Sequence, residues 1–242
     1  MHTHEPALLS VRDLAVAFDG KKIIDRVSFN LYPSDVLAVI GPNGAGKSVL
    51  LKTLVGIIPK TAGEVIWAPG VKIGYLPQRF HVDHYLPMTV KEFLQLKPRA
   101  KHNFKEALTM AHVDHAFLKK NLAYLSSGQL QKVLLAWTLI DQPNLLLFDE
   151  PTENVDMVGQ ESIYSLLHEL QDTLGIAIVI VSHDLHVVYR YADHVLCLNR
   201  DMICFGEPHT ELTEKTLTEL YGDHAFFHHH RDAHAEHEHR HD

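Results

Sequence analysis

The stretch Gly41-Pro42-Asn43-Gly44-Ala45-Gly46-Lys47-Ser48 fits the pattern G-x-x-x-x-G-K-[ST], which is typical of a loop that binds phosphate groups. An apolar run at 36–40 precedes it and apolar residues at helical spacing follow at 49–55, as in a strand–loop–helix unit. Glycines let backbone N–H groups turn toward an anion, and a helix N-terminus favours negative charge. We therefore expect these eight residues to bind a nucleotide, with Lys47 at the β- and γ-phosphates and the Ser48 hydroxyl on Mg²⁺. The alternative is a plain glycine turn, which would not need the Lys-Ser pair.

The composition limits the class of protein. The chain has 242 residues, 46% of them hydrophobic, which suffices for one sizeable α/β domain. A net charge of −8 gives no basic surface for nucleic acid, so we expect no nucleic-acid partner. The start of the chain lacks a signal-peptide pattern, and the longest apolar run, 176–181, is far shorter than the ~20 residues that span a bilayer. We expect a soluble chain that reaches a membrane only through a partner.

Two cysteines, Cys197 and Cys204, lie in apolar runs near the end of the expected core. Buried free thiols are the expectation for a cytoplasmic chain, with a disulfide or a metal-binding pair as the alternatives.

Strand and helix patterns alternate along most of the chain. Residues 14–18 and 27–31 alternate as strands, joined by a turn at Asp19-Gly20. Further strands are expected at 64–67, 71–76, 145–148, 176–181, 195–199 and 202–205, and helices at 130–140, 157–174, 184–192 and 210–221. Between about 85 and 140 helical patterns replace the strands, and Thr89-x-x-Glu92 and Asn103-x-x-Glu106 predict capping boxes. This order predicts an α/β core with an N-terminal antiparallel β subdomain and a helical subdomain at about 85–140.

Two acidic residues, Asp149 and Glu150, directly follow the apolar run 145–148. We expect this run to be a buried strand next to the strand that leads into the phosphate loop. Asp149 could then hold Mg²⁺, directly or through water, and Glu150 could polarise a water for attack on the γ-phosphate. A solvated acidic turn is the alternative.

The segment Leu125-Ser126-Ser127-Gly128-Gln129 resembles the LSGGQ signature of ATP-binding cassette (ABC) ATPases, and it precedes Asp149-Glu150 as it does in that family. Gln78 matches the family's Q-loop, 153–156 its D-loop and His183 its switch histidine. Phe18 falls where the family places an aromatic residue beside adenine. The resemblance covers residues 8 to about 222, and it implies a P-loop NTPase core with a helical signature subdomain.

The resemblance also implies roles for these residues. Two chains would close head to tail as a homodimer, with ATP between the phosphate loop of one chain and Ser126, Ser127, Gly128 and Gln129 of the other. Asp156 of the D-loop would couple the two sites. His183 would bind the γ-phosphate and orient the attacking water, and Gln78 would join Ser48 and Asp149 around Mg²⁺.

Four positions qualify the resemblance. Phe18 would stack on adenine, but a core position in a strand fits it nearly as well. Ser127 stands where the signature has its first glycine, which the negative φ at the start of a helix tolerates. Glu153 and Asn154 replace the usual small residues of the D-loop.

A finer resemblance is to the ATPase subunits of bacterial zinc-uptake ABC importers, carried by 73–78, 86–90, 181–186 and 195–199 and by a histidine-rich C-terminal end. It implies an ATPase that powers metal import through an integral-membrane permease dimer, contacted by 79–87, with a periplasmic or extracellular metal-binding protein in the same system. The chain would lie peripherally at the cytoplasmic face of the bacterial inner membrane. Manganese and iron importer ATPases share much of the pattern. A soluble non-transport ABC ATPase and a metal-binding regulator are the rivals from other classes.

The last twenty residues, 223–242, differ from the rest of the chain. They contain eight histidines and almost no apolar residues after Phe227, so we expect a flexible tail beyond an ABC ATPase domain at 1–222. Neutral imidazole is a good zinc ligand, and a zinc site is expected from the tail histidines. Those expected to bind are His228, His229, His230, His234, His237, His239 and His241. A solvated polar tail and the residue of an expression tag are the alternatives.

Overall fold

The computed structural model describes residues 6–78, 80, 87–98, 100–151 and 155–222. Three groups of expectations lie outside these residues: the histidines of the tail, Glu153 and Asn154 of the D-loop, and most of the segment 79–87.

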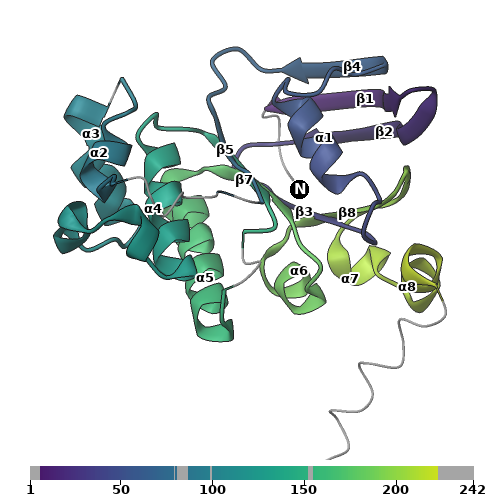
Figure 1. Cartoon of the computed structure of the whole chain (residues 1–242). Helices are drawn as coiled ribbons and strands as arrows, with labels where there is room; N and C mark the ends of the chain where they lie inside the picture. Colours follow the sequence, from purple (N-terminus) through teal and green to yellow (C-terminus); the bar gives the residue numbers. More distant parts are fainter. Residues whose placement is uncertain (1–5, 79, 81–86, 99, 152–154, 223–242) are drawn as a thin grey trace, which may run out of the picture.

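The described strands form one mixed sheet in the order β4-β1-β2-β9-β8-β3-β7-β6-β5 (Figure 1). Their bounds are β1 Leu9–Phe18, β2 Lys21–Leu31, β3 Val36–Ile40, β4 Ala62–Trp67, β5 Ile73–Leu76, β6 Leu145–Asp149, β7 Ala177–Val181, β8 His194–Asn199 and β9 Asp201–Gly206. β1 pairs antiparallel with β2 and β4, which confirms the N-terminal antiparallel strands. β8, β3, β7, β6 and β5 run parallel. The expectation that the strand before Asp149 lies next to β3 is wrong, because β7 lies between β3 and β6.

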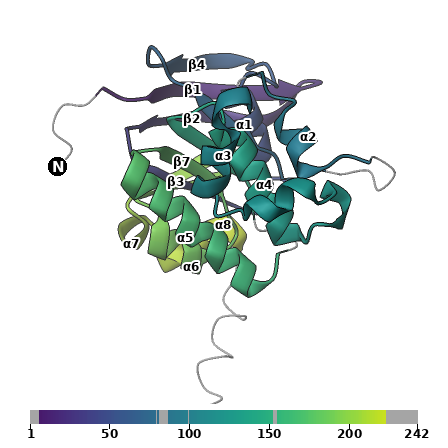
Figure 2. The ribbon, with the colours of Figure 1, turned by 90° about the vertical axis from the view of Figure 1, so that its left-hand side faces the viewer.

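Helices cover both faces of the parallel strands. Their bounds are α1 Lys47–Leu54, α2 Val90–Leu94, α3 Ala100–Met110, α4 Ser127–Leu139, α5 Met157–Leu174, α6 Leu185–Tyr191, α7 Pro208–Glu211 and α8 Glu214–Tyr221, with 3₁₀ turns η1 at His115–Lys119 and η2 at Leu122–Tyr124. Figure 2 shows α5 and α6 on the side of β3 and β7 opposite to β1, β2 and β4. Within the described part of the chain, no helix combines the length and the apolar character needed to cross a bilayer.

The core lies on both sides of the central strands. In β3, Val36, Ala38 and Ile40 pack toward α4, α5 and α6, while Leu37 and Val39 pack toward α1, β1 and β2. All residues of β3, β6 and β7 are buried. This is why each of these strands has an unbroken apolar run in place of an alternating pattern.

Local signals locate some helix ends and miss others. Thr89 caps α2 and forms the predicted box with Glu92. The box predicted at Asn103 is wrong, because α3 already begins at Ala100. The single helix expected at 210–221 is also wrong. α7 ends at Glu211, and Thr213 starts α8 by accepting the N–H of Thr216 at 3.2 Å.

The two cysteines form a disulfide, so the expectation of free thiols is wrong. Cys197 of β8 and Cys204 of β9 are directly opposite each other in the antiparallel hairpin. Opposite residues in such a pair point to the same face of the sheet, which brings the two sulfur atoms together.

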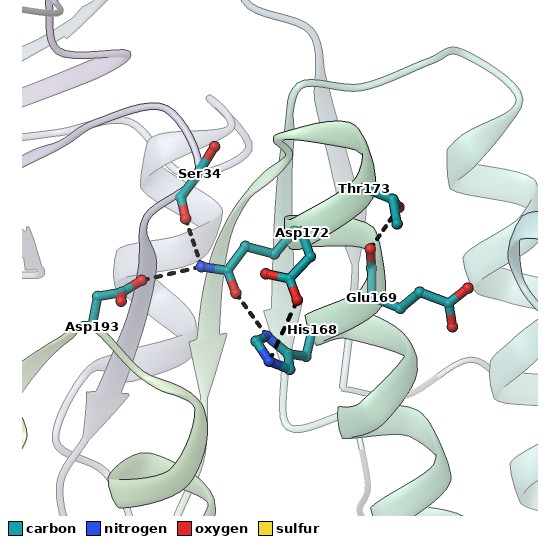
Figure 3. Close-up of polar contacts among 7 residues, drawn as sticks. Ser34, His168, Glu169, Asp172, Thr173 and Asp193 are labelled. Atoms are coloured by element: carbon teal, nitrogen blue, oxygen red, sulfur yellow. Dashed lines mark hydrogen bonds and ion pairs between the residues drawn. The ribbon is translucent and has the colours of Figure 1, made fainter.

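Gln171, in the last turn of α5, binds the residues that precede β3 and β8, at the ends of these strands remote from the phosphate loop. Its partners Ser34, His168 and Asp193 are labelled in Figure 3. Its Nε2 donates to the carbonyl oxygen of Ser34 at 2.7 Å and to the Asp193 carboxylate at 3.3 Å. Its Oε1 lies 3.1 Å from Nδ1 of His168. Asp193 also accepts the N–H of Val36 at 2.8 Å. Hydrogen bonds therefore join Ser34, just before β3, to α5, and Val36, the first residue of β3, to Asp193 just before β8.

Candidate functional site

The phosphate-loop pattern forms the connection between β3 and α1, as expected. Gly46 has a φ of 102° and precedes the first residue of α1 without any side-chain cap. A Cβ at Gly46 would lie 2.9 Å from the carbonyl oxygen of Ile23, so both the backbone conformation and the space require glycine. Because no side chain caps the helix, the N–H groups of its first turn can bind an anion.

Lys47 points back into the loop. Its side chain is buried, and Nζ donates to the carbonyl oxygens of Gly41 at 2.8 Å and Pro42 at 3.1 Å. Burial lowers the pKa of Lys47, while the charges of Glu150 and Asp149 oppose the shift. A cation held in a site that disfavours its charge gains from an anion placed beside it.

Asp149 ends β6 and is 1% exposed, which rules out the solvated acidic turn for this residue. Its Oδ1 accepts the Ser48 hydroxyl at 2.8 Å. Its Oδ2 is buried and has no hydrogen-bond partner among the described residues. Burial raises the pKa of Asp149, and the hydrogen bond from Ser48 opposes this. A buried carboxylate with an unpaired oxygen beside a serine hydroxyl is an oxygen-donor set that suits Mg²⁺.

Glu150 directly follows Asp149 and has a φ of 51°, a left-handed conformation that is uncommon for residues other than glycine. Such strain costs about 1–3 kcal/mol and is concentrated at functional sites. Gln78, which follows β5, donates from Nε2 to Glu150 Oε2 at 2.8 Å. His183 is exposed just after β7. The neighbouring strands β3, β7, β6 and β5 thus bring their carboxyl ends to the same edge of the sheet. The phosphate loop, His183, Glu150 and Gln78 follow these strands in that order. Ligands bind at this edge in open α/β folds.

A cavity of about 780 Å³ lies at this edge. Its lining consists of Ile23, Asn43, Gly44, Ala45, Gly46, Lys47, Ser48, Val49, Gln78, Glu150 and His183. The structure therefore brings together most of the residues that the sequence indicated. Ile23 was missed, because it lies in β2 next to core residue Ile24 and carries no motif of its own. Val49 was expected only as a core residue of α1.

Phe18 is not among the residues that line this cavity. It ends β1 and is 44% exposed, so the core alternative for it is wrong. Gly41, Pro42 and Asp149 are also not among the lining residues. Gly41 and Pro42 accept hydrogen bonds from Lys47, and Asp149 accepts one from Ser48.

The signature residues lie around a second cavity, of about 400 Å³. Its lining consists of Ser126, Ser127, Gly128, Gln129, Lys132, Val155, Asp156, Gly159 and Ser162. Lys132 and Ser162 were not indicated by the sequence; Lys132 Nζ donates to Ser162 Oγ at 2.8 Å. None of the phosphate-loop residues lines this second cavity. In one chain the two motifs therefore form two separate sites.

Helix capping shapes the second cavity. Ser126 Oγ accepts the N–H of Gln129 at 3.3 Å, and Gln129 Oε1 accepts the N–H of Ser126 at 3.2 Å, so a capping box is present at the start of α4. Ser127 is the first residue of α4 and is not among the residues with positive φ. Asp156 caps α5 by accepting the N–H of Gly159 at 2.8 Å.

Comparison with known proteins identifies the fold. The family model described as "ABC transporter" matches residues 24–153, just over half of the chain. The chain belongs to this family. It is an ABC ATPase, an enzyme that hydrolyses ATP.

Curated relatives of this ABC ATPase cover most of its length. The chain is 45% identical over 220 residues to "Zinc import ATP-binding protein ZnuC 1" of Hahella chejuensis, covering 91% of this chain and 86% of that protein. It is 40% identical over 226 residues to "Zinc import ATP-binding protein ZnuC" of Pasteurella multocida, covering 92% and 86%.

Solved structures support the same family. The structure described as "An inward-facing conformation of a putative metal-chelate type ABC transporter" superposes with a TM-score of 0.81 at 29% identity, over 89% of each chain. CbiO1 of Clostridium perfringens, part of an ABC transporter complex, superposes with a TM-score of 0.74 at 26% identity, over 89% of this chain and 94% of that one. In the part of the ABC ATPase that the structure describes, no group of three or more His, Cys, Asp or Glu side chains could hold a metal ion.

Proposed function

We propose that this ABC ATPase is the ATP-hydrolysing subunit of an importer for a divalent metal, and that the metal is zinc. The observation that carries the proposal is the identity of 40–45% to zinc import ATP-binding proteins over about nine-tenths of the chain. The sequence left manganese and iron open as the transported metal, and the growth test described below distinguishes them from zinc.

In this proposal the first cavity binds ATP. The backbone of Gly41, Pro42, Asn43, Gly44, Ala45 and Gly46 and the side chain of Lys47 hold the phosphates. Ser48 Oγ, Asp149 and Gln78 would hold Mg²⁺, which supplies positive charge against the phosphate oxygens. The ring of Phe18 would stack on adenine.

Hydrolysis requires one water and one base. Glu150 takes a proton from the water as its oxygen bonds to the γ-phosphorus, and the bond from that phosphorus to the β–γ bridging oxygen breaks, giving ADP and phosphate. Gln78 orients the Glu150 carboxylate through the bond at 2.8 Å. His183, on the cavity wall, hydrogen-bonds the γ-phosphate and orients the water.

The separation of the two cavities supports a homodimer. Ser126, Ser127, Gly128 and Gln129 of one chain would close on the ATP held by the partner chain, with Asp156 coupling the two sites. The Ser126 oxygen accepts a bond within its own chain, which leaves its proton free to be donated to a phosphate oxygen. The start of α4 adds a dipole that favours the γ-phosphate.

The remaining parts of the system are inferred from the relatives. The homodimer would lie at the cytoplasmic face of the bacterial inner membrane beneath an integral-membrane permease dimer, supplied by a periplasmic or extracellular metal-binding protein. Closure on ATP and reopening after hydrolysis would switch the permease between its two faces. Residues 223–242 would bind zinc as a sensor or buffer through their histidines.

Growth of the native host tests the transported metal. Cells that lack this gene should fail to grow in medium depleted of zinc by a chelator, and the wild-type gene should restore growth and uptake of radioactive zinc. Lys47→Ala, which removes the charge on the phosphates, serves as the inactive control. Restored uptake of manganese or iron in place of zinc would overturn the assignment of the metal while leaving the ATPase intact.

A further inference from the structure

The second cavity is lined by the starts of two helices, α4 and α5, which lie side by side (Figure 1). Ser126 of the signature caps α4, and Asp156 of the D-loop caps α5. β6 lies between the two helices in sequence, so no short connection joins their starts. Contacts between the helices must therefore set the distance from the signature to the D-loop.

The starts of both helices project from the apolar core. The first buried residue of α4 is Val133, and the first buried residue of α5 is Ile163. The residues that precede them in the two helices, 127–132 and 157–162, are half-buried or exposed. Close packing fixes the buried part of a helix, so it constrains these two projecting segments less than the rest.

A hydrogen bond joins the two helices at the point where they leave the core. Lys132, the residue before Val133, donates from Nζ to Oγ of Ser162, the residue before Ile163, at 2.8 Å. Each partner lies six residues beyond the N-cap of its own helix, which corresponds to about 9 Å along the helix axis. Both partners also line the second cavity. The bond thus ties α4 to α5 at the same distance from both caps.

The ammonium group of Lys132 makes this bond a strong one. The bond is partly buried, and Lys132 forms no ion pair in the part of the chain that the structure describes. A hydrogen bond with a charged donor is stronger than a neutral one. If α4 tilted by about 6° at this point, Ser126 would move by about 1 Å, a displacement that can cost an enzyme a large part of its rate.

We propose that Lys132 and Ser162 are positioning residues for the composite ATP site: their hydrogen bond holds the signature at a fixed distance from Asp156, so that both meet the partner chain's phosphate loop together. This proposal rests on the homodimer proposed above. The bond is already present in the single chain, so it preorganises the surface before the partner chain binds.

Two substitutions break the bond in different ways. Ser162→Ala keeps the charge of Lys132, whereas Lys132→Met removes the charge as well. Each should raise the dissociation constant of the ATP-bound dimer roughly 3- to 10-fold, the contribution of one hydrogen bond. The double variant should lose no more than either single variant, because both changes act on the same bond. Lys132→Arg, whose guanidinium can also donate to Ser162, should restore most of the affinity.

Sedimentation of the full-length chain with Mg²⁺ and a non-hydrolysable ATP analogue measures the dimer, and calorimetry measures nucleotide binding by the single chain. The Kd of the single chain should stay unchanged, because neither residue lines the first cavity. Lys60→Met is the matched control. Lys60 Nζ donates to the carbonyl oxygen of Gly63 at 2.7 Å, away from both cavities, so this variant should form the dimer like wild type.

Mixed dimers show which chain carries the effect. In a heterodimer of wild type with Lys47→Ala, ATP is held by the wild-type chain and faces the signature of the Lys47→Ala chain. Adding Lys132→Met to the Lys47→Ala chain should lower the ATPase rate roughly 3- to 10-fold. Adding it to the chain that holds ATP should leave the rate unchanged, because the signature of that chain faces an empty loop.

The outcomes separate the two proposals. If wild type dimerises with ATP, and Ser162→Ala and Lys132→Met dimerise equally well, the positioning role is overturned and the homodimer stands. A loss in Lys132→Met without a loss in Ser162→Ala also overturns it, because the charge and not the bond would then matter. If Lys132→Met does not fold, Ser162→Ala decides by the same measurement. If wild type itself binds ATP but does not dimerise, the homodimer falls and the role of Lys132 and Ser162 with it.

Discussion

Replacing Glu150 by glutamine tests the chemistry of the first cavity with the smallest change of shape. The glutamine oxygen can still accept Gln78 Nε2, which now lies 2.8 Å from Glu150 Oε2. Glutamine has the same length as glutamate, so the left-handed backbone conformation at this position, with a φ of 51°, should not change. The fold and the phosphate loop should therefore be unchanged in Glu150→Gln.

The expected loss is confined to turnover. A general base contributes about 10²–10⁴ in rate, and each tenfold corresponds to about 1.4 kcal/mol of barrier. We therefore expect kcat to fall by roughly that factor, which is about 3–5.5 kcal/mol. ATP should bind at least as tightly as before, because one negative charge beside the phosphates has been removed.

Phosphate release at saturating ATP measures turnover, and sedimentation with ATP and Mg²⁺ measures the dimer. The variant should accumulate as an ATP-bound dimer, because closure occurs without hydrolysis. Lys47→Ala is the control and should lose nucleotide binding itself. Turnover of Glu150→Gln within about threefold of the wild type would refute the role of Glu150 as the base.

Three further expectations follow from the two cavities, the buried carboxylate and the tail. Mixing Lys47→Ala with Ser126→Arg should restore part of the ATPase activity, because each mixed dimer retains one intact composite site; no recovery in proven heterodimers would count against that site. Asp149→Asn should raise the melting temperature without nucleotide at pH 7. The raised pKa of Asp149 means that the native fold disfavours its charge, so the difference should shrink as the pH falls toward that pKa and the wild-type carboxyl becomes neutral; a lower melting temperature at pH 7 would contradict this. Deleting 223–242 should abolish most zinc binding measured by calorimetry and keep the ATPase activity, and zinc binding by the full chain should weaken below pH ~6.5 as imidazole is protonated; equal zinc binding by both forms would refute the tail as the site.

Features set by a few neighbouring residues were predictable from the sequence. The phosphate loop needs a glycine at 46 and a lysine at 47, and these residues stand side by side in the chain. The capping box predicted at Thr89 needs only four residues. The pattern at Asn103 matched the same box but failed, because helical residues before it extend α3 back to Ala100.

Features set by contacts between distant segments were not predictable. The place of β7 between β3 and β6 depends on the packing of the whole sheet, which no single strand specifies. The Cys197–Cys204 disulfide follows from the register of β8 and β9, while composition indicates only the redox compartment. Ile23 reaches the cavity through the hairpin of β1 and β2. The roles of Glu150, His183 and Phe18 toward ATP stay predictions.

The pairing of β5 with β6 bears on how such a chain can change over evolution. Ile73 lies opposite Leu145 in this parallel pair, so the long helical segment leaves at the C-terminal end of β5 and re-enters at the N-terminal end of the adjacent strand β6. The hydrogen bonds between β5 and β6 fix the positions of both ends of this segment, whatever lies between them. The entropy of closing a loop grows only slowly with its length, so insertions and exchanges there cost the sheet little. The helical segment that carries the signature can thus be replaced or reoriented while the strand ends around the phosphate loop keep their register.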